Sequence, residues 1–351
     1  MKSKQKNKIV MCNCHCFIIP PFVESKLNKT LKVKNPLTHK MSLDFRKRRD
    51  EKIALAPLAA SISLIPAKAR RLVYDSQNTT RQRLLLKRSE GNGPVRGDAA
   101  INKAYDYAGV VRDYFQKNYG YNSWDNQGSD LILNVHFSTN YNNAFWDGDE
   151  MTFGDGDGRV FTSFVNSIDV TAHELAHGVV QTTCGLIYEK QPGALNEHFA
   201  DVFGSVVKQH LNGETARTSN WLIGDTIMGP TLQGQAIRSM KAPGTAYNNP
   251  LMGKDPQPDH MKNYYSGSGD HYGVHINSGI PNKVFYLVSM AISTKKAGLL
   301  WFETLKTLST KTNFKQFKAL LLKMAKSLVA KGKVPANTVT VATNAFAQVG
   351  L

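Results

Sequence analysis

The feature that most constrains this chain is the five-residue segment HELAH, in which Glu174 follows His173 and His177 lies one helical turn later. Residues four apart lie on one face of an α-helix, so a helix here directs both imidazoles at one point. Two histidines at this spacing are typical zinc ligands, and the glutamate between them lies beside a metal-bound water. The segment predicts a zinc site; the alternative is two histidines on an ordinary amphipathic helix.

A third ligand follows on a helix predicted to span residues 194–211. Glu197 lies 24 residues after His173, and a catalytic zinc takes three protein ligands while keeping one position for water. Asp201 comes one turn later, where its carboxylate can accept the second ring N–H of His173. The surrounding residues are apolar, and buried carboxylates without partners are costly. A metal site therefore explains this pair of carboxylates better than a solvated helix face does.

The positive charge of the chain is concentrated near its N-terminus. Residues 1–71 contain 17 of the 44 Lys and Arg but only 4 of the 27 Asp and Glu, so they carry +13 of the net charge of +17. The remainder is nearly balanced, and the basic segment shows no aromatic-interleaved motif, so a nucleic-acid-binding protein is the weaker alternative. A basic pro-segment that packs on an acidic surface also explains the asymmetry.

The N-terminal residues do not read as a targeting or membrane segment. No apolar run reaches the ~20 residues of a spanning helix. The first 22 residues lack a clean apolar core and a small-residue cleavage site, so we expect either a cytoplasmic protein or export by a non-classical route. Cys12, Cys14 and Cys16 lie close together and Cys184 is alone, which is no disulfide framework.

The spacing of apolar residues predicts a β-rich half before the histidine helix and an α-rich half after it. Asp98 is placed to cap a helix that Gly120 ends, and Ser167 to cap the histidine helix. Alternation over residues 131–137 predicts a half-buried strand. The remaining predicted elements are helices at residues 51–66, 283–296, 299–308 and 314–330, and a tight turn at 154–158.

The motif residues His173, Glu174 and His177, together with Glu197 and Asp201, resemble those of the thermolysin-like zinc metalloendopeptidases. The resemblance covers about residues 72–351 and follows the order of the family's motifs. The segment CFIIPPF at residues 16–22 is similar to the short pro-segment of the protealysin-like branch. The supporting blocks are YNNAFW at 141–146, GDGDG at 154–158, GLIY at 185–188, IRSM at 237–240 and GVHINSG at 273–279.

The resemblance implies an α+β fold with a β-rich N-terminal lobe, an α-helical C-terminal lobe and the zinc helix between them. We assign residues 1–70 to a pro-segment, 71–183 to the first lobe including the zinc helix, and 184–351 to the second. The implied protein is the zymogen of a neutral endopeptidase that cleaves on the amino side of bulky hydrophobic residues. We expect a monomer acting on proteins or peptides, without nucleic-acid or membrane partners.

The resemblance also implies a role for each motif residue. Zinc is bound by His173, His177 and Glu197, while Glu174 moves the proton of the attacking water. Tyr188 and His275 hold the oxyanion, and Asp270 orients His275. The zinc-binding histidines are supported by Asn196 and Asp201. The substrate backbone is held by Asn143, the Ala144 carbonyl and Arg238. An apolar pocket is lined by Phe161, Phe164, Val170 and Ile237, which could equally belong to the plain core.

The pro-segment is expected to inhibit the active site through the block that contains Cys16, Pro20, Pro21 and Phe22. Two modes remain open at this point. A thiolate of one of the three clustered cysteines can take the open zinc position, or residues 17–22 dock in the cleft through apolar contacts. Removal of the segment is predicted at the basic stretch at residues 68–72.

Calcium is the point at which this sequence departs from the family. Members with a paired calcium site place a carboxylate eleven residues after the zinc-binding glutamate, and this chain has Lys208 there. Asp169 and Asp225 are retained, but two further matching positions hold Asn220 and Leu222. Calcium needs six to eight oxygen ligands, and an ammonium group repels it. We therefore predict zinc but no paired calcium site.

Two rival functions remain beside nucleic-acid binding. One is a zinc hydrolase restricted to small peptides. The other is a catalytically silent member of the family that acts as a binder, and the presence of Glu174, Tyr188 and His275 argues against it.

Overall fold

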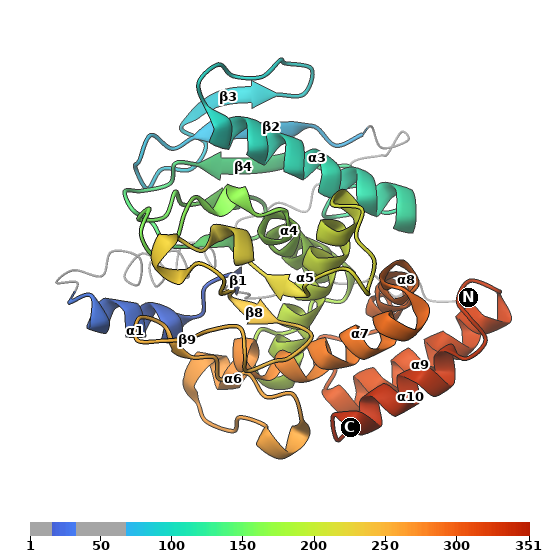
Figure 1. Cartoon of the computed structure of the whole chain (residues 1–351). Coiled ribbons are helices and arrows are strands. Elements are labelled where there is room, and N and C mark those ends of the chain that lie inside the picture. Colours follow the sequence, from blue (N-terminus) through green and yellow to red (C-terminus); the bar gives the residue numbers. More distant parts are fainter. Residues whose placement is uncertain (1–15, 33–67) are drawn as a thin grey trace, which may run out of the picture.

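The computed structural model describes residues 16–32 and 68–351; the helix predicted at 51–66 lies outside this part of the chain, as do Cys12 and Cys14. Two lobes meet along a central pair of helices, α4 (Ile168–Thr183) and α5 (Lys190–Leu211) (Figure 1). The sheet lies on one side of this pair, and most of the C-terminal helices lie on the other. The predicted two-lobed α+β fold is confirmed.

The N-terminal lobe is built on a six-stranded mixed sheet with the strand order β1-β5-β6-β4-β2-β3. The pairs β2–β4 and β4–β6 are parallel, and the other three pairs are antiparallel. The edge strand β1 belongs to the predicted pro-segment, where no strand was predicted. The strands are β1 (Cys16–Phe17), β2 (Arg71–Asp75), β3 (Leu85–Ser89), β4 (Leu131–Val135), β5 (Ala144–Trp146) and β6 (Met151–Phe153).

Strand β4 differs from its prediction as a half-buried strand extending to Phe137. It ends at Val135, because His136 takes a left-handed φ of 52°. Its polar position is also inside the protein: Asn134 is fully buried, donates to Glu150 Oε2 at 2.9 Å and accepts from the Arg83 backbone N–H at 2.6 Å. The alternation of apolar and polar residues therefore reflects a buried polar network on the second face of the strand, and that face is not exposed to solvent.

Helix α3 (Ala99–Tyr119) packs against β2 and β4. The residues predicted to cap its two ends are confirmed. The Asp98 carboxylate accepts from the Ile101 backbone N–H at 3.0 Å. Gly120 ends the helix in the left-handed region with φ 64°, which glycine adopts without steric cost.

Glycines let neighbouring elements approach α4 and α5: β5 approaches α4 at Gly178, and α4 approaches α5 at Gly204. A Cβ on Gly178 of α4 would lie 2.8 Å from the Trp146 ring, and one on Gly204 of α5 would lie 2.8 Å from the Asp169 carbonyl oxygen. Helix α5 begins at Lys190, four residues before the predicted start. Ser167 precedes α4, but its hydroxyl bonds the Asp169 carboxylate and makes no cap to the helix.

The C-terminal lobe packs five helices behind α5, and short paired strands lie in its connecting loops. The predicted helices at 283–296 and 299–308 are present but begin four or five residues earlier, and the last helix was not predicted.

No helix among the described residues combines the length and apolar character needed to cross a membrane. The helices are α6 (Gly269–Asn277), α7 (Gly279–Ile292), α8 (Thr294–Leu305), α9 (Phe314–Ala330) and α10 (Thr338–Gln348); the short strands are β7 (Leu222–Ile223), β8 (Arg238–Ser239), β9 (Asn248–Asn249) and β10 (Gly253–Lys254); the 3₁₀ turns are η1 (Phe164–Asn166), η2 (Asp225–Ile227), η3 (Pro230–Leu232) and η4 (Met261–Asn263).

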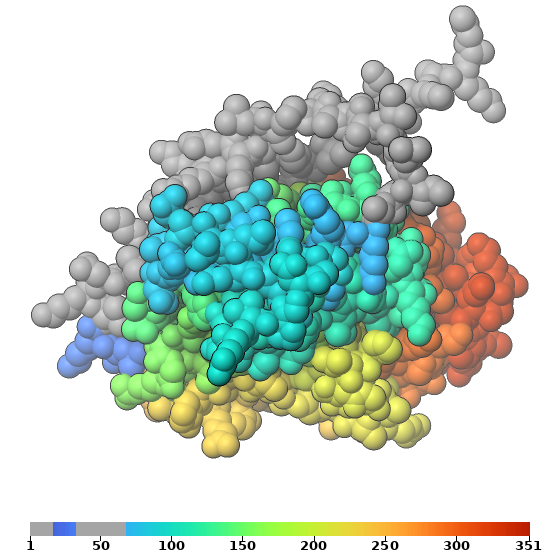
Figure 2. Space-filling view, turned by 90° about the horizontal axis from the view of Figure 1, so that it is seen from above, coloured from blue at the N-terminus to red at the C-terminus, as the bar shows by residue number. Residues whose placement is uncertain are grey.

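Helix α1 (Pro21–Thr30) continues the chain from β1 along the outside of the molecule. It lies beside β9 (Figure 1), and its blue atoms adjoin the green part of the N-terminal lobe at one end of the molecule (Figure 2). Val23 and Leu27 are buried in the main core, which joins this part of the pro-segment to the rest of the protein.

Candidate metal centre and active site

The three predicted zinc ligands come together between α4 and α5. The Nε2 atoms of His173 and His177 lie 3.0 Å apart, and each is 3.6 Å from an oxygen of Glu197. All three side chains are buried. The helical spacing of the two histidines places both on the face of α4 that contacts α5, and Glu197 meets them from the neighbouring helix.

The other ring nitrogen of each histidine is held by a polar side chain of α5. His173 Nδ1 lies 3.0 Å from Asp201 Oδ1, and His177 Nδ1 lies 2.8 Å from Asn196 Oδ1. Burial, and then the proximity of His173, hold the pKa of His177 well below its usual range. A neutral imidazole whose Nδ1–H is fixed in this way presents the Nε2 lone pair that a metal requires.

These residues fit a zinc ion. Two imidazole nitrogens and one carboxylate make the ligand set of a catalytic zinc site with one position left for water. Glu174 is fully buried, and neither of its carboxylate oxygens has a hydrogen-bond partner among the described residues. Burial, and then the charge of Glu197, raise the pKa of Glu174 well above its usual value. A bound metal and its water remove the cost of burying such a group.

The predicted oxyanion residues lie next to the ligands. His275 Nε2 is 3.1 Å from the Tyr188 hydroxyl, and that hydroxyl bonds Glu197 Oε1. Asp270 reaches His275 because residues 270–273 all take left-handed conformations, which turn its carboxylate back onto His275 Nδ1 at 2.6 Å. Burial opposes protonation, but the carboxylates of Glu197 and Asp270 raise the pKa of His275 to about 9.

The residues predicted to bind the substrate backbone contact the predicted pro-segment. Asn143 makes two hydrogen bonds with Ile19, through Oδ1 to its N–H at 3.0 Å and through Nδ2 to its carbonyl at 3.2 Å. The Ala144 carbonyl accepts from the Ile18 N–H at 3.2 Å, and Arg238 Nη1 donates to the Ile18 carbonyl at 3.0 Å. The segment thus occupies the groups expected to hold a substrate.

The four residues proposed as pocket walls belong to the same buried core cluster as Ile18. Their contact with the side chain of a substrate remains a prediction. They are Phe161, Phe164, Val170 and Ile237, and each is at most 2% exposed.

Two supporting residues were not identified from the sequence. Asn282 donates to Asp201 Oδ2 at 2.9 Å, and its own oxygen bonds His198 Nδ1 at 2.7 Å. Glu24 of α1 accepts from Asn143 Nδ2 at 2.7 Å. A polar residue within an otherwise apolar helical stretch was the available signal for Asn282. The role of Glu24 depends on a contact between residues 119 positions apart, which no local pattern reveals.

Lys208 lies between Asp169 and Asp225, where the sequence predicts that no paired calcium site forms. Its ammonium is 3.1 Å from Asp169 Oδ2, 2.5 Å from Asp225 Oδ1 and 2.9 Å from the Leu222 carbonyl. Burial lowers its pKa, but the two carboxylates outweigh that effect and raise the pKa of Lys208 to about 12. Asn220 also donates to Asp225, at 2.8 Å.

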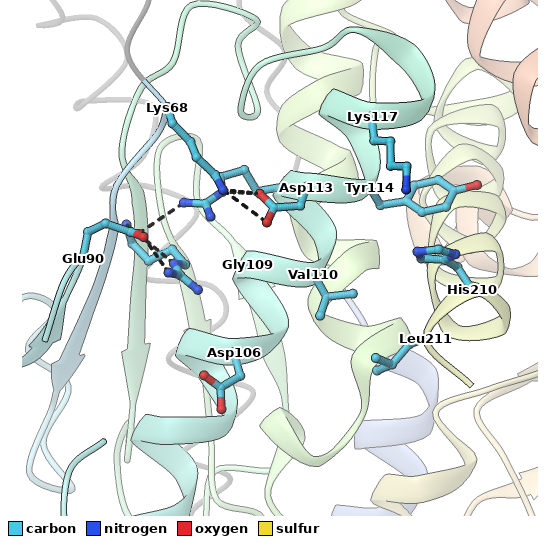
Figure 3. Close-up of a pocket in the computed structure, with 12 residues that line it drawn as sticks. Lys68, Glu90, Asp106, Gly109, Val110, Asp113, Tyr114, Lys117, His210 and Leu211 are labelled. Carbon is cyan, nitrogen blue, oxygen red and sulfur yellow. Dashed lines mark hydrogen bonds and ion pairs between the residues drawn. The ribbon is translucent and has the colours of Figure 1, made fainter. Parts of the chain in front are cut away.

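An open cavity of about 660 Å³ lies between residues 68–71, α3 and the end of α5, and neither His173 nor His177 lines it (Figure 3). Ion pairs lie at its border: Lys68 with Asp113 at 3.1 Å, and Arg112 with Asp113 at 2.8 Å and Glu90 at 3.2 Å. Arg112 also donates to the Ala69 carbonyl at 2.6 Å. The cavity is therefore bordered by contacts that fasten residues 68 and 69 to the first lobe.

Comparisons with known proteins place the chain in a family. The catalytic-domain model of the thermolysin metallopeptidases matches residues 49–181, and the model of their α-helical domain matches residues 184–351. An extracellular metalloprotease of Pectobacterium carotovorum subsp. carotovorum is 41% identical over 314 residues, covering 86% of this chain and 88% of that protein. A thermolysin of Alicyclobacillus acidocaldarius subsp. acidocaldarius is 39% identical over 259 residues, covering 71% and 45%. The structure of the protealysin precursor from Serratia proteamaculans matches with a TM-score of 0.81 and 39% identity, over 95% of this chain and 99% of that chain.

Proposed function

The chain belongs to the thermolysin metallopeptidase family, as a zinc metalloendopeptidase of its protealysin-like branch, and we propose that it is a latent precursor whose mature form cleaves on the amino side of bulky hydrophobic residues. The observation that carries the proposal is the set of backbone hydrogen bonds between residues 17–19 and the substrate-binding groups.

The chemistry follows from the residues around the metal site. Zinc held by His173, His177 and Glu197 would polarise the peptide carbonyl and lower the pKa of a bound water. Glu174 takes the proton of that water and passes it to the leaving nitrogen. Tyr188 and His275 donate to the oxygen on which negative charge develops, and Asp270 keeps the His275 ring in place.

Latency is supported by competition for the same groups. A substrate strand and the pro-segment both need the Ala144 carbonyl, the Asn143 amide and the Arg238 guanidinium, and these groups are already hydrogen-bonded to Ile18 and Ile19. Two kinds of contact hold residues 17–19: hydrogen bonds of their backbone, and the burial of their apolar side chains, which supports the docking mode. The thiols of Cys12, Cys14 and Cys16 lie outside what the structure describes. Binding of one of these thiolates at the zinc position therefore stays a prediction.

The proposed cleavage before bulky hydrophobic residues is supported by Ile18, whose carbonyl accepts a hydrogen bond from Arg238. Ile18 is fully buried within the core that contains the four wall residues. An apolar pocket discriminates by about 1–3 kcal/mol per methylene, so the preference for Leu, Phe, Ile and Val is graded.

The test compares the full chain with the same protein after limited trypsin treatment has removed the segment before Lys68, with both species checked by intact mass. Casein and a peptide library are the substrates, and a zinc chelator followed by added zinc is the control. The processed protein should cleave before Leu, Phe, Ile and Val, and the full chain should be much less active. Equal activity of the two forms would reject latency, and a library dominated by Arg, Lys or Asp at that position would reject the specificity.

A further inference from the structure

The pro-segment does more than cover the site, because its backbone follows the register of a substrate. Strand β1 runs antiparallel to β5, with Phe17 opposite Phe145. The carbonyl of Phe17 accepts from His275 Nε2 at 3.1 Å, so it lies against a group that holds the oxyanion. The next residue, Ile18, donates its N–H to the Ala144 carbonyl and offers its own carbonyl to Arg238.

This register singles out one peptide bond. The bond that a protease breaks follows directly after the carbonyl at its oxyanion-stabilising groups. Here that is the bond between Phe17 and Ile18. Ile18, the residue after the bond, is fully buried and hydrophobic, as the proposed specificity requires.

From this geometry we infer that the protein cleaves its own chain between Phe17 and Ile18. The inference rests on the proposed function and names one substrate bond for it. Water adds its oxygen to the Phe17 carbonyl carbon, and the carbon–nitrogen bond to Ile18 breaks. Both protons of the water end on the Ile18 nitrogen, the first of them carried by Glu174. The products are a carboxylate at Phe17 and an ammonium at Ile18, with no other reactant.

The cut alone does not open the site. Residues 18–30 remain attached through the two hydrogen bonds of Ile19 with Asn143, the bond between Glu24 and Asn143, and the buried Val23 and Leu27 of α1. The segment beyond the cut therefore stays on the groups that bind the residues after the scissile bond. Self-cleavage at this position yields a nicked protein that is still latent towards casein.

The experiment follows the purified zinc-loaded full chain by intact mass spectrometry and N-terminal sequencing. We expect loss of residues 1–17 and a new N-terminus at Ile18, at a first-order rate that does not change over a tenfold range of protein concentration. A tagged Glu174→Ala chain mixed into the same tube should stay intact during this phase, because the reaction is intramolecular. Ile18→Val removes one methylene and should slow the cut by about 10- to 200-fold, whereas Ile18→Asp, which places a charge in an apolar site, should abolish it.

Hydrogen exchange in the Glu174→Ala chain tests the register without any turnover. The amides of Ile18 and Ile19 should be protected, and Ile18→Asp should remove this protection while α3 and α5 keep theirs. Unprotected amides in the Glu174→Ala chain overturn the inference. So does a full chain that stays intact at this bond while the processed enzyme hydrolyses peptides, and in that case the proposed function stands. A processed, zinc-loaded enzyme that cleaves no peptide rejects the proposed function itself.

Discussion

Glu174 is a fully buried carboxylate whose oxygens lack hydrogen-bond partners among the described residues, next to a carboxylate that serves as a ligand. Such an arrangement destabilises a protein unless a metal and its water complete it. At the residue scale, the site therefore combines residues needed for catalysis with a burial that lowers the stability of the fold. Single substitutions can measure the effect on catalysis and the effect on stability separately.

Glu174→Ala should keep zinc and lose catalysis, because it removes the proton carrier and no ligand. General bases contribute about 10²- to 10⁴-fold, so kcat/KM of the processed enzyme on a peptide should fall by at least that range. Zinc content by elemental analysis should remain one per chain, whereas His173→Ala should lose the metal. Near-normal turnover of Glu174→Ala would contradict its assigned role.

Lys208→Met should destabilise the protein, because Asp169 and Asp225 lose the cation buried between them. Removing one partner of a buried ion pair costs about 3–5 kcal/mol, measured as the free energy of unfolding in denaturant. Lys295→Met, at an exposed lysine, should change it by about 0.5 kcal/mol or less.

Calcium should not substitute for Lys208 in the wild type, since the ammonium already contacts the oxygens that an ion would need. Millimolar calcium should leave the melting temperature nearly unchanged, and zinc alone should reverse inactivation by EDTA. Two calcium ions bound between α4 and α5 would refute this prediction, whereas a single ion in a distant loop would not.

His136 should make stability depend on pH. Its hydrogen bond to Asp155 is the main reason that its pKa rises to about 9, with Asp98 adding to the effect and burial opposing it. A histidine whose pKa is raised on folding stabilises the native state fully below its unfolded value of about 6.5, and this contribution is lost as the pH rises through about 9. The difference in unfolding free energy between wild type and His136→Gln should therefore shrink between pH 6.5 and 9.5; a constant difference would show that the ion pairs do not cause it.

At the element scale, β1 and α1 act together in the proposed latency: the strand contacts the groups expected to bind a substrate, and the helix anchors the strand. The strand alone is two residues long, and a short edge strand is weakly held by its own hydrogen bonds. The buried residues of α1 supply the apolar area that keeps the strand in place.

Leu27→Asp should therefore raise the casein activity of the full chain. Leu27 is buried in the main core, and a charge there favours release of α1. Ser25→Asp introduces the same residue at an exposed position of the same helix and should leave latency unchanged. Equal activity of the two variants would mean that α1 does not hold the inhibitory strand.

At the scale of the whole molecule, the contacts that begin at Lys68 fasten this part of the chain to the first lobe. Ala69 is buried with its carbonyl bonded to Arg112, and β2, starting at Arg71, lies between β3 and β4. Cleavage within residues 68–72, expected from the basic sequence, requires opening these ion pairs and an inner strand.

We therefore expect the mature N-terminus to lie before Lys68, which revises the position predicted from the sequence. N-terminal sequencing of the activated enzyme decides this. A mature chain that begins at Leu72 or later would contradict it, because β2 would lose its first residue and the ion pair of Arg71 with Glu90.

The sequence by itself determined the features that depend on local spacing. Two histidines one turn apart, a glutamate beside them and capped helices such as α3 are recognisable because helical geometry relates neighbouring residues directly. The motif order extended this to the family and to a fold of two lobes. The predicted element boundaries were less accurate, as the early start of α5 and the missed α10 show.

Tertiary structure alone decided the features that join distant parts of the chain. The pairing of β1 with β5, the bond between Glu24 and Asn143, and the support of Asp201 by Asn282 each connect residues 81 or more positions apart. Such contacts leave no periodic trace, because they depend on how completed elements pack and not on the order of neighbouring side chains. The choice of Phe17–Ile18 as the bond held in the active site is of this kind, since the register exists only once the strand has docked.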